Sequence, residues 1–301
     1  MECFGDTSLL RDLHQPSVLL STGKKRRRAL IVLAGGTAGA TSAEVLRALD
    51  DTGIKAHHFD VIVGVSAGAF NAAAYAAGDS AQVRNVYENV CMHMYAVSLT
   101  GGGWRLFDEL AHIMRETFNQ EAARQNPSEL RVVLTDLVGK FHLYDAKKPA
   151  DMVDALLASA SVPWFTNGTP LEGKIWVDGA CGHPCPLAYI AREFRPHDVL
   201  VVGSRARPEH QHWVETWSFP FVVHTFMMWH SWALKTSTVA LDQKLDETLA
   251  LFKSKRRKMR LTGIFPTGES AIFPLEARGS EIAKKGDEAY AYTRKLLDTH
   301  R

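Results

Sequence analysis

Cysteine is scarce in this sequence, with four residues among 301. So few cysteines in a chain of this length do not make a disulfide framework. Cys181 and Cys185 flank His183, but their spacing fits no common zinc motif and no second pair of ligands lies nearby in the sequence. We therefore expect no metal at this position, and the sequence predicts no cofactor.

Long apolar runs and net charge are lacking as well. The longest apolar stretch, residues 213–234, is interrupted by Glu215, Pro220, His224 and His230, so we expect no membrane span. The formal net charge is only +2, which argues against a nucleic-acid partner. The beginning of the chain also lacks the apolar segment of a signal peptide, so we expect a cytoplasmic protein.

Positive charge is nevertheless concentrated in two runs, residues 24–28 and 253–258. Residues 1–28 show no clear helical or alternating period, and we interpret them as a mobile basic arm ahead of a single domain over residues 29–301. The basic runs either bind anionic lipid head groups, at about 1 kcal/mol per residue, or form solvated surface. Peripheral membrane contact therefore stays open.

Apolar residues make up 46% of the chain and occur in short runs that alternate with helical patterns. Continuous apolar runs are typical of strands buried on both faces of a sheet. Strands are predicted over residues 29–34, 59–64, 130–136, 140–144, 174–178, 198–203 and 260–265. Helices are predicted over residues 41–49, 67–77, 149–158 and 280–297, with residues 212–257 mostly helical. This alternation predicts a three-layer α/β/α fold with a mostly parallel central sheet.

The segment Gly-Val-Ser-Ala-Gly at residues 64–68 lies between a predicted buried strand and a predicted Ala-rich helix. A serine in such a tight turn exposes its hydroxyl at the end of the sheet, as a nucleophile requires. Gly64 and Gly68 leave space for chains that pass close by. The following helix directs free N–H groups and its positive dipole end toward the reaction centre. We therefore interpret Ser66 as the nucleophile of an acyl hydrolase.

A second glycine-rich turn, Ala-Gly-Gly-Thr-Ala-Gly at residues 34–39, also joins a predicted strand to a predicted helix. One interpretation is a dinucleotide-binding fingerprint, in which an alanine replaces the first glycine. The other is an oxyanion hole formed by the backbone N–H groups of Gly35, Gly36 and Thr37. Parallel strands end at one edge of a sheet, so this turn and Ser66 should lie side by side, which favours the oxyanion hole.

The general base has two candidates in the sequence. A Ser-His-Asp triad is one, but no feature singles out one of the 13 histidines, and Ser66 follows only the second predicted strand. Asp178 is the other, because it ends a predicted strand and is followed by Gly179. A carboxylate within about 3 Å of the serine hydroxyl takes its proton directly. A simple turn-forming aspartate is the alternative interpretation.

Together these segments resemble the patatin-like phospholipases. The similarity is carried by the glycine-rich turn at residues 34–39, the serine turn at residues 64–68 and Asp-Gly-Ala at residues 178–180. A weaker match is Ala-Ser-Ala-Ser-Val-Pro at residues 158–163. The resemblance spans residues 29 to about 205, and its motifs are specific as a set and in this order.

The resemblance implies a Ser-Asp dyad without a catalytic histidine, with Ser66 as the nucleophile and Asp178 as the base. It also implies an oxyanion hole and a set of motif glycines. These residues are Gly35, Gly36 and Thr37 for the oxyanion hole, and Gly39, Gly64, Gly68 and Gly179 for the motifs. The implied substrate is a lipid carboxylic ester, of the kind that a lipase, phospholipase A or lysophospholipase cleaves.

Two positions depart from the family pattern. Ala34 stands where glycine is usual, and Ala38 where arginine or lysine is usual. Backbone donors survive such changes, because they belong to the main chain. A lipid acyl hydrolase is therefore the first hypothesis, a catalytically weak protein that binds lipid or a protein partner the second, and a dinucleotide-binding oxidoreductase the third. The aromatic stretch from Trp213 to Trp232 is interpreted as the acyl pocket or as plain helical core.

Overall fold

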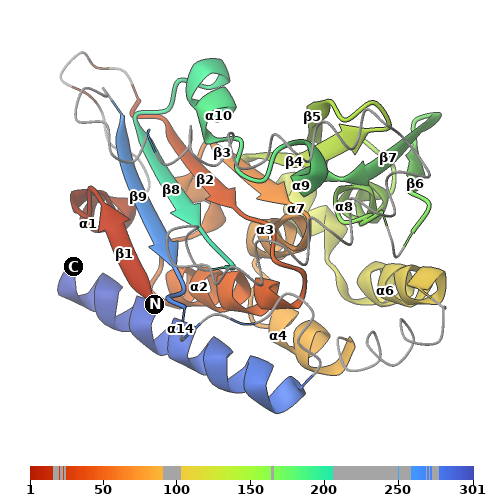
Figure 1. Ribbon diagram of the computed structural model, residues 1–301. Coiled ribbons are helices and arrows are strands. Elements are labelled where there is room, and N and C mark those ends of the chain that lie inside the picture. The colour runs from red at the N-terminus through yellow and green to blue at the C-terminus, as the bar shows by residue number, and fades with distance from the viewer. Residues whose placement is uncertain are drawn as a thin grey trace.

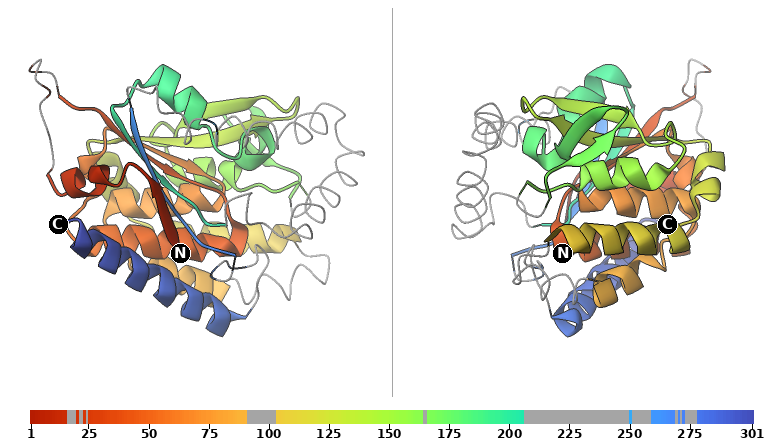
Figure 2. Two further views of the ribbon diagram at one scale, coloured as in Figure 1. Left: turned by 60° about the vertical axis from the view of Figure 1, so that its left-hand side comes forward. Right: turned by 90° about the vertical axis from the view of Figure 1, so that its right-hand side faces the viewer.

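The computed structural model describes residues 1–15, 25–90, 103–163, 166–205, 259–268 and 278–301, together with residues 20, 23, 250, 270 and 272. Its centre is a nine-stranded sheet in the order β1-β9-β8-β2-β3-β4-β7-β6, with β5 paired to β4 (Figure 1). Helices cover both faces of this sheet (Figure 2). The predicted three-layer α/β/α fold is confirmed.

The strands are β1 (Glu2–Gly5), β2 (Arg28–Val32), β3 (Val61–Val65), β4 (Glu129–Asp136), β5 (Phe141–Asp145), β6 (Thr169–Leu171), β7 (Lys174–Asp178), β8 (Asp198–Val202) and β9 (Arg260–Phe265). The helices are α1 (Ser8–Leu13), η1 (Gly36–Ala38), α2 (Gly39–Asp51), η2 (Ala56–His58), α3 (Ala67–Ala77), α4 (Val83–Asn85), η3 (Val86–Val90), α6 (Gly103–Thr117), α7 (Gln120–Gln125), α8 (Met152–Ser159), α9 (Gly179–Gly182), α10 (Leu187–Glu193) and α14 (Gly279–Thr299). Strands β9, β8, β2, β3 and β4 are mutually parallel, whereas β1, β5, β6 and β7 pair in antiparallel fashion.

Successive residues of the central strands are buried in two different cores. In β2, Leu30 and Val32 pack in the core that contains α2, α3 and α8, while Ala29 and Ile31 pack in the core beside α10. Figure 2 shows these two layers, with α14 lying outside α2. Because both faces are covered, the strands read as continuous apolar runs in the sequence.

Residues 1–15 are part of the fold, whereas the sequence predicts a mobile arm over residues 1–28. β1 pairs with β9, so that Glu2 lies opposite Phe265. α1 then buries Leu9, Leu10 and Leu13 completely. A four-residue edge strand and a six-residue helix are too short to produce a clear period, so their pairing and burial depend on residues distant in sequence.

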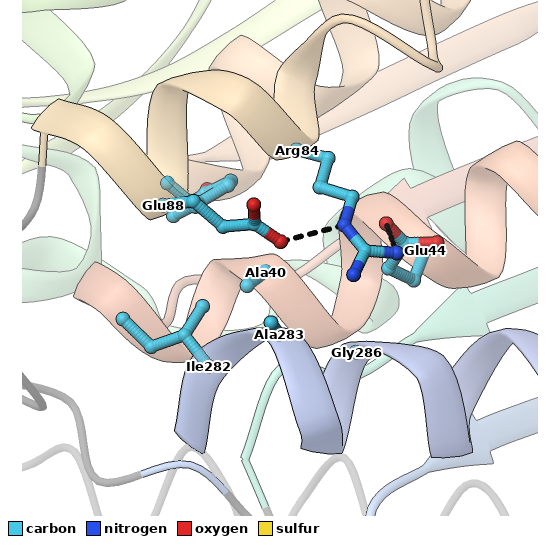
Figure 3. Close-up of a pocket in the computed structure, with 8 residues that line it drawn as sticks. Ala40, Glu44, Arg84, Glu88, Ile282, Ala283 and Gly286 are labelled. Atoms are coloured by element: carbon cyan, nitrogen blue, oxygen red, sulfur yellow. Dashed lines mark hydrogen bonds and ion pairs between the residues drawn. The ribbon is translucent and has the colours of Figure 1, made fainter. Parts of the chain in front are cut away.

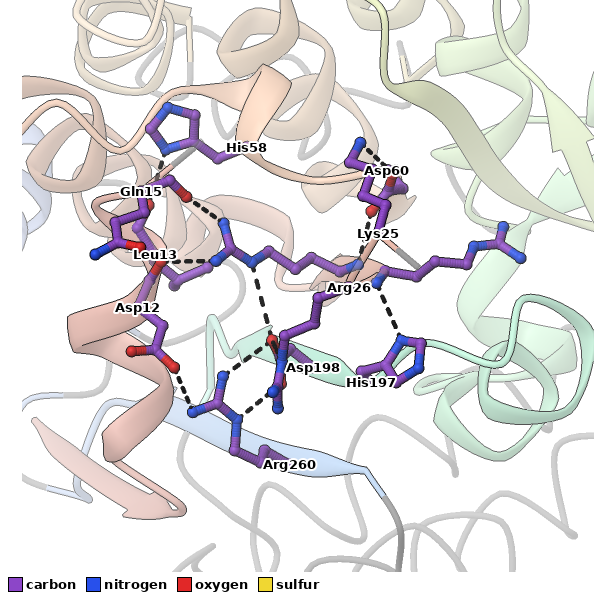
Figure 4. Close-up of polar contacts among 12 residues, drawn as sticks. Asp12, Leu13, Gln15, Lys25, Arg26, His58, Asp60, His197, Asp198 and Arg260 are labelled. Atoms are coloured by element: carbon purple, nitrogen blue, oxygen red, sulfur yellow. Dashed lines mark hydrogen bonds and ion pairs between the residues drawn. The ribbon is translucent and has the colours of Figure 1, made fainter. Parts of the chain in front are cut away.

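Charged side chains neutralise one another at the amino ends of the strands (Figure 4). Asp198, which begins β8, lies 2.6 Å from Nε of Arg26, 2.8 Å from Nε of Arg260 and 3.8 Å from Nε of Arg28. These amino ends lie at the end of the strands opposite the turn between β3 and α3. Three of the basic side chains in the run at residues 24–28, those of Lys25, Arg26 and Arg28, therefore form ion pairs within the fold.

Several sequence predictions concern residues outside the described ranges. They are the aromatic stretch from Trp213 to Trp232, most of the helical segment at residues 212–257 and the basic run at residues 253–258. Among the helices that the structure does describe, none combines the length and the apolar character that a bilayer crossing needs.

Candidate active site

The turn between β3 and α3 holds Ser66 in a backbone conformation that few non-glycine residues adopt. Its φ is 54° and its ψ is −126°. Such conformations cost of order 1–3 kcal/mol and cluster at functional sites. A Cβ atom on Gly68 would lie 2.4 Å from the carbonyl oxygen of Val32, and one on Gly64 would lie 2.4 Å from Cα of Ala69. Both glycines are required because neighbouring backbone leaves no room for a side chain.

Asp178 reaches this turn from a strand that runs the other way. In the pairing of β3 with β4, Val65 lies opposite Val133, and the next β4 residue, Leu134, lies opposite Asp178 of antiparallel β7. β5 occupies the other edge of β4 over these residues, so β3 and β7 share one edge and meet end to end. By its sequence, Asp178 looks like one more strand end of a parallel sheet. The end-to-end meeting of β3 and β7 is what places it beside Ser66.

The two side chains are joined by a hydrogen bond. The Ser66 hydroxyl donates to Asp178, with 2.5 Å between Oγ and Oδ2. Oδ1 of Asp178 accepts from the N–H of Ala180 at 2.8 Å, so the carboxylate also caps α9. Burial raises the pKa of Asp178 to about 6, although the hydrogen bonds from Ser66 and Ala180 favour its ionised form. The carboxylate is therefore ionised at neutral pH and is more basic than an ordinary aspartate.

Two buried hydroxyl groups hold the backbone on either side of this pair. Ser159 Oγ accepts from the N–H of Ser66 at 3.0 Å and donates to the carbonyl of Val133 at 2.8 Å. Thr135 Oγ1 donates to the carbonyl of Asp178 at 2.8 Å. Ser159 belongs to the weak sequence match at residues 158–163, but nothing in that pattern indicated its contact with Ser66.

The glycine-rich turn at residues 34–39 lies beside Ser66, as its place after β2 predicts. A Cβ atom on Gly39 would come within 2.9 Å of the Ala67 side chain. Among the described residues, the N–H groups of Gly35 and Gly36 donate no hydrogen bond to another part of the chain, which is what an oxyanion hole needs. The assignment of these amides, with that of Thr37, as the oxyanion hole stays a prediction.

Ala38, which departs from the family pattern, is fully buried. It packs in a small apolar cluster with Tyr87, Ile272 and Ile282. This apolar environment suits a methyl group and is unfavourable for a charged side chain. The alanine at this position is therefore accommodated by apolar packing, which also stabilises the backbone of the glycine-rich turn.

Two cavities lie away from Ser66 and Asp178. One, of about 10 Å³, is enclosed by α2, α4, η3 and α14 and is lined by Glu44, Arg84 and Glu88 among others (Figure 3). That volume holds about one water molecule. The other, of about 270 Å³, lies between the end of α3, α4 and α6 and is lined largely by apolar side chains, including Met114 and Phe118. Neither cavity is lined by Ser66 or Asp178.

Comparison with known proteins identifies a family whose matched range includes the residues of this site. The sequence model of the family described as patatin-like phospholipase matches residues 30–191, more than half of the chain. Both Ser66 and Asp178 fall inside the matched range.

Individual relatives are more distant. Uncharacterized NTE family proteins from Mycobacterium bovis and Mycobacterium tuberculosis are each 25% identical over 183 residues, which is 58% of this chain. The chain spans about half the length of these curated relatives, covering 49% of each. Among solved structures, VipD from Legionella pneumophila is similar with a TM-score of 0.45 and 14% identity, over 94% of this chain and 70% of that one.

Proposed function

Because the chain belongs to the patatin-like phospholipase family, we propose that it hydrolyses carboxylic esters of lipids through Ser66 and Asp178. The observation that carries the proposal is the hydrogen bond from Ser66 Oγ to Asp178 Oδ2. A buried carboxylate with a raised pKa, in direct contact with a strained serine, has the properties of a general base paired with a nucleophile.

In the first half of the reaction, Asp178 accepts the hydroxyl proton while Ser66 Oγ forms a bond to the ester carbonyl carbon. The electrons of the carbonyl double bond move onto its oxygen, and the N–H groups of Gly35, Gly36 and Thr37 are proposed to stabilise this charge. The intermediate then expels the alcohol, which takes the proton back from Asp178. An acyl group remains on Ser66.

In the second half, water replaces the alcohol. Asp178 accepts a proton from water while the water oxygen attacks the acyl carbon. Collapse of the intermediate then breaks the bond from Ser66 Oγ to the acyl carbon and releases the fatty acid, and Asp178 returns its proton to Ser66 Oγ. The positive dipole end of α3, which begins directly after Ser66, favours negative charge at this centre. No histidine takes part in this scheme, and His183 instead packs its ring against Phe141 at 5.2 Å between centroids.

A second candidate is a protein that binds lipid with little hydrolysis. Ala38 favours it, since the basic side chain usual at this position in the family is replaced by a buried methyl group. The oxidoreductase hypothesis is weaker, because the glycine-rich turn packs against the serine turn. A dinucleotide-binding site has no use for an exposed serine at that place.

Covalent labelling by a fluorophosphonate probe tests the proposal. We expect the purified protein to react and the Ser66→Ala variant not to react. The same proteins should then be assayed on short p-nitrophenyl esters and on a panel of phospholipids, lysophospholipids and acylglycerols. Hydrolysis that disappears with Ser66→Ala would support the proposed function and identify the preferred lipid.

Other results would redirect the assignment. An unlabelled protein that hydrolyses neither short esters nor lipids would leave the lipid-binding candidate. Full esterase activity in an Asp178→Asn variant would mean that another group is the base. Binding of NAD or FAD by the purified protein would return attention to the oxidoreductase hypothesis.

A further inference from the structure

Exposed large apolar side chains are few in the part of the chain that the structure describes. They are Leu137, Val138 and Ile175, which are 46%, 68% and 39% exposed. Leu137 and Val138 form the turn between β4 and β5, and Ile175 lies in β7. Single exposed apolar residues are ordinary, so what matters is whether these three lie together.

The strand register brings them together. Asp136 lies opposite Trp176 in the last pair of β4 with β7, and Leu137 and Ile175 directly adjoin this pair at the same end of the ladder. We call Leu137, Val138 and Ile175 the hairpin patch. Leu137 lies three residues beyond Leu134, the partner of Asp178, which corresponds to about 10 Å along the strand. The patch therefore borders the catalytic pair, in the region of β4, β5 and β7 in Figure 1.

The turn that presents the patch is held in a defined shape. Oδ1 of Asp136 accepts hydrogen bonds from the N–H groups of Val138, at 3.1 Å, and Lys140, at 2.9 Å. Its other carboxylate oxygen lies 2.8 Å from Nε2 of His142. Gly139 adopts a φ of 80°, which closes the turn. The apolar side chains are thus directed outward by a built turn and not left exposed by a loose one.

Of the carboxylates beside the patch, Asp136 is taken up by the hydrogen bonds of the turn and Glu172 pairs with Lys148. The charges left are those of two lysines beside the patch. Lys140 and Lys174 are exposed next to it, and within the described residues neither forms an ion pair. Lys174 instead lies 5.9 Å from the centre of the Trp176 ring. This contrasts with Arg26 at the opposite edge, whose charge is neutralised by Asp198.

We propose that the hairpin patch docks the protein on an anionic lipid surface, with Leu137, Val138 and Ile175 entering the apolar boundary and the two lysines contacting head groups. The inference rests on the proposed function, which requires a lipid ester to reach Ser66. Three side chains form a much smaller area than the roughly 800 Å² per partner of a stable protein interface, so a membrane fits the patch better than a protein does. Each lysine near an anionic surface adds favourable binding free energy, and apolar insertion adds more.

Co-sedimentation with vesicles tests the docking independently of catalysis, because it can be measured with the Ser66→Ala protein. We expect binding to vesicles of phosphatidylcholine with phosphatidylserine, and weaker binding to phosphatidylcholine alone. The double variants Leu137→Asp/Val138→Asp and Lys140→Glu/Lys174→Glu should each bind the anionic vesicles at least about tenfold more weakly. Lys284→Glu/Lys295→Glu changes the same charge on the distant helix α14 and should bind like the parent protein.

Circular dichroism and thermal unfolding of each variant establish that it is folded before its binding is compared. Equal binding by parent and hairpin variants, or an equal loss in the α14 control, would overturn the proposal. Absence of vesicle binding by the parent protein would also overturn it and would make a protein partner the occupant to seek. If vesicles are bound but the lipid panel is not hydrolysed, the docking surface stands and the proposed function fails.

Discussion

Replacing Asp178 by asparagine should make the protein more stable at neutral pH while abolishing its esterase activity. Asparagine has nearly the same shape and can still accept the hydrogen bond from the N–H of Ala180. It cannot take a proton from Ser66. The substitution therefore removes the free-energy cost of burying a charge and leaves the packing of the side chain unchanged.

The size of the effect follows from the pKa. Burial raises the pKa of Asp178 from an ordinary value of 3.8 to about 6 in the folded protein. Each pH unit between the two values corresponds to about 1.4 kcal/mol, so ionising this buried group costs about 3 kcal/mol of stability, to order of magnitude. The pKa of Asp178 is higher in the folded state than in the unfolded state, so protonation of this carboxyl group stabilises the fold. This contribution is complete below pH about 4 and is lost as the pH rises through about 6.

Urea unfolding of the parent protein and the Asp178→Asn variant at a series of pH values measures this contribution. We expect the two free energies of unfolding to converge near pH 4 and to differ by about 3 kcal/mol at pH 8, with the variant more stable. In parallel, kcat/KM of the parent should fall about tenfold per pH unit below pH about 6, because only the carboxylate acts as base.

A constant difference in stability across this pH range would contradict this prediction, because it would mean that Asp178 is not a buried ionised group. A variant less stable than the parent at pH 8 would mean that the hydrogen bonds of the carboxylate outweigh its desolvation. An esterase profile flat down to pH 4 would exclude Asp178 as the titrating base.

Three further substitutions test how the site and the sheet are held. Ser159→Ala leaves the Ser66 N–H and a β4 carbonyl without their buried partner, so we expect kcat to fall about tenfold with KM little changed. Ser161→Ala removes the hydroxyl of another buried serine two residues away and is the matched control. Equal effects of the two substitutions would contradict a positioning role of Ser159. Gly179→Ala would bring a Cβ atom within 2.1 Å of the Val133 carbonyl oxygen, so it should displace Asp178 and slow fluorophosphonate labelling. Labelling at the parent rate would instead show that α9 can shift without cost. Asp198→Asn leaves Arg26 and Arg28 without their carboxylate, while Arg260 keeps Asp12, and it should lower the free energy of unfolding by about 3–5 kcal/mol. An unchanged urea midpoint would show that solvent compensates these charges.

The local features of this protein follow from its sequence alone. Apolar runs buried on both faces predict the central strands, and the Gly-Val-Ser-Ala-Gly segment predicts the turn that carries Ser66. Each of these depends on residues within a few positions of one another, through strand burial, backbone sterics and helix formation. The glycine-rich turn after β2 belongs to the same class, because parallel neighbouring strands end at one edge.

Contacts between distant residues decided the rest. Pairing with β9, some 260 residues later, makes the first half of the predicted mobile arm an edge strand and a buried helix. Ser159 meets Ser66 only because α8 packs against the end of β3 and β4. Asp178 is the clearest case: its sequence predicts a strand end, but only the antiparallel pairing of β7 on the edge of β4 that β3 also uses brings its carboxylate to Ser66. The direction of a five-residue strand is set by its partners, and its own sequence does not encode it.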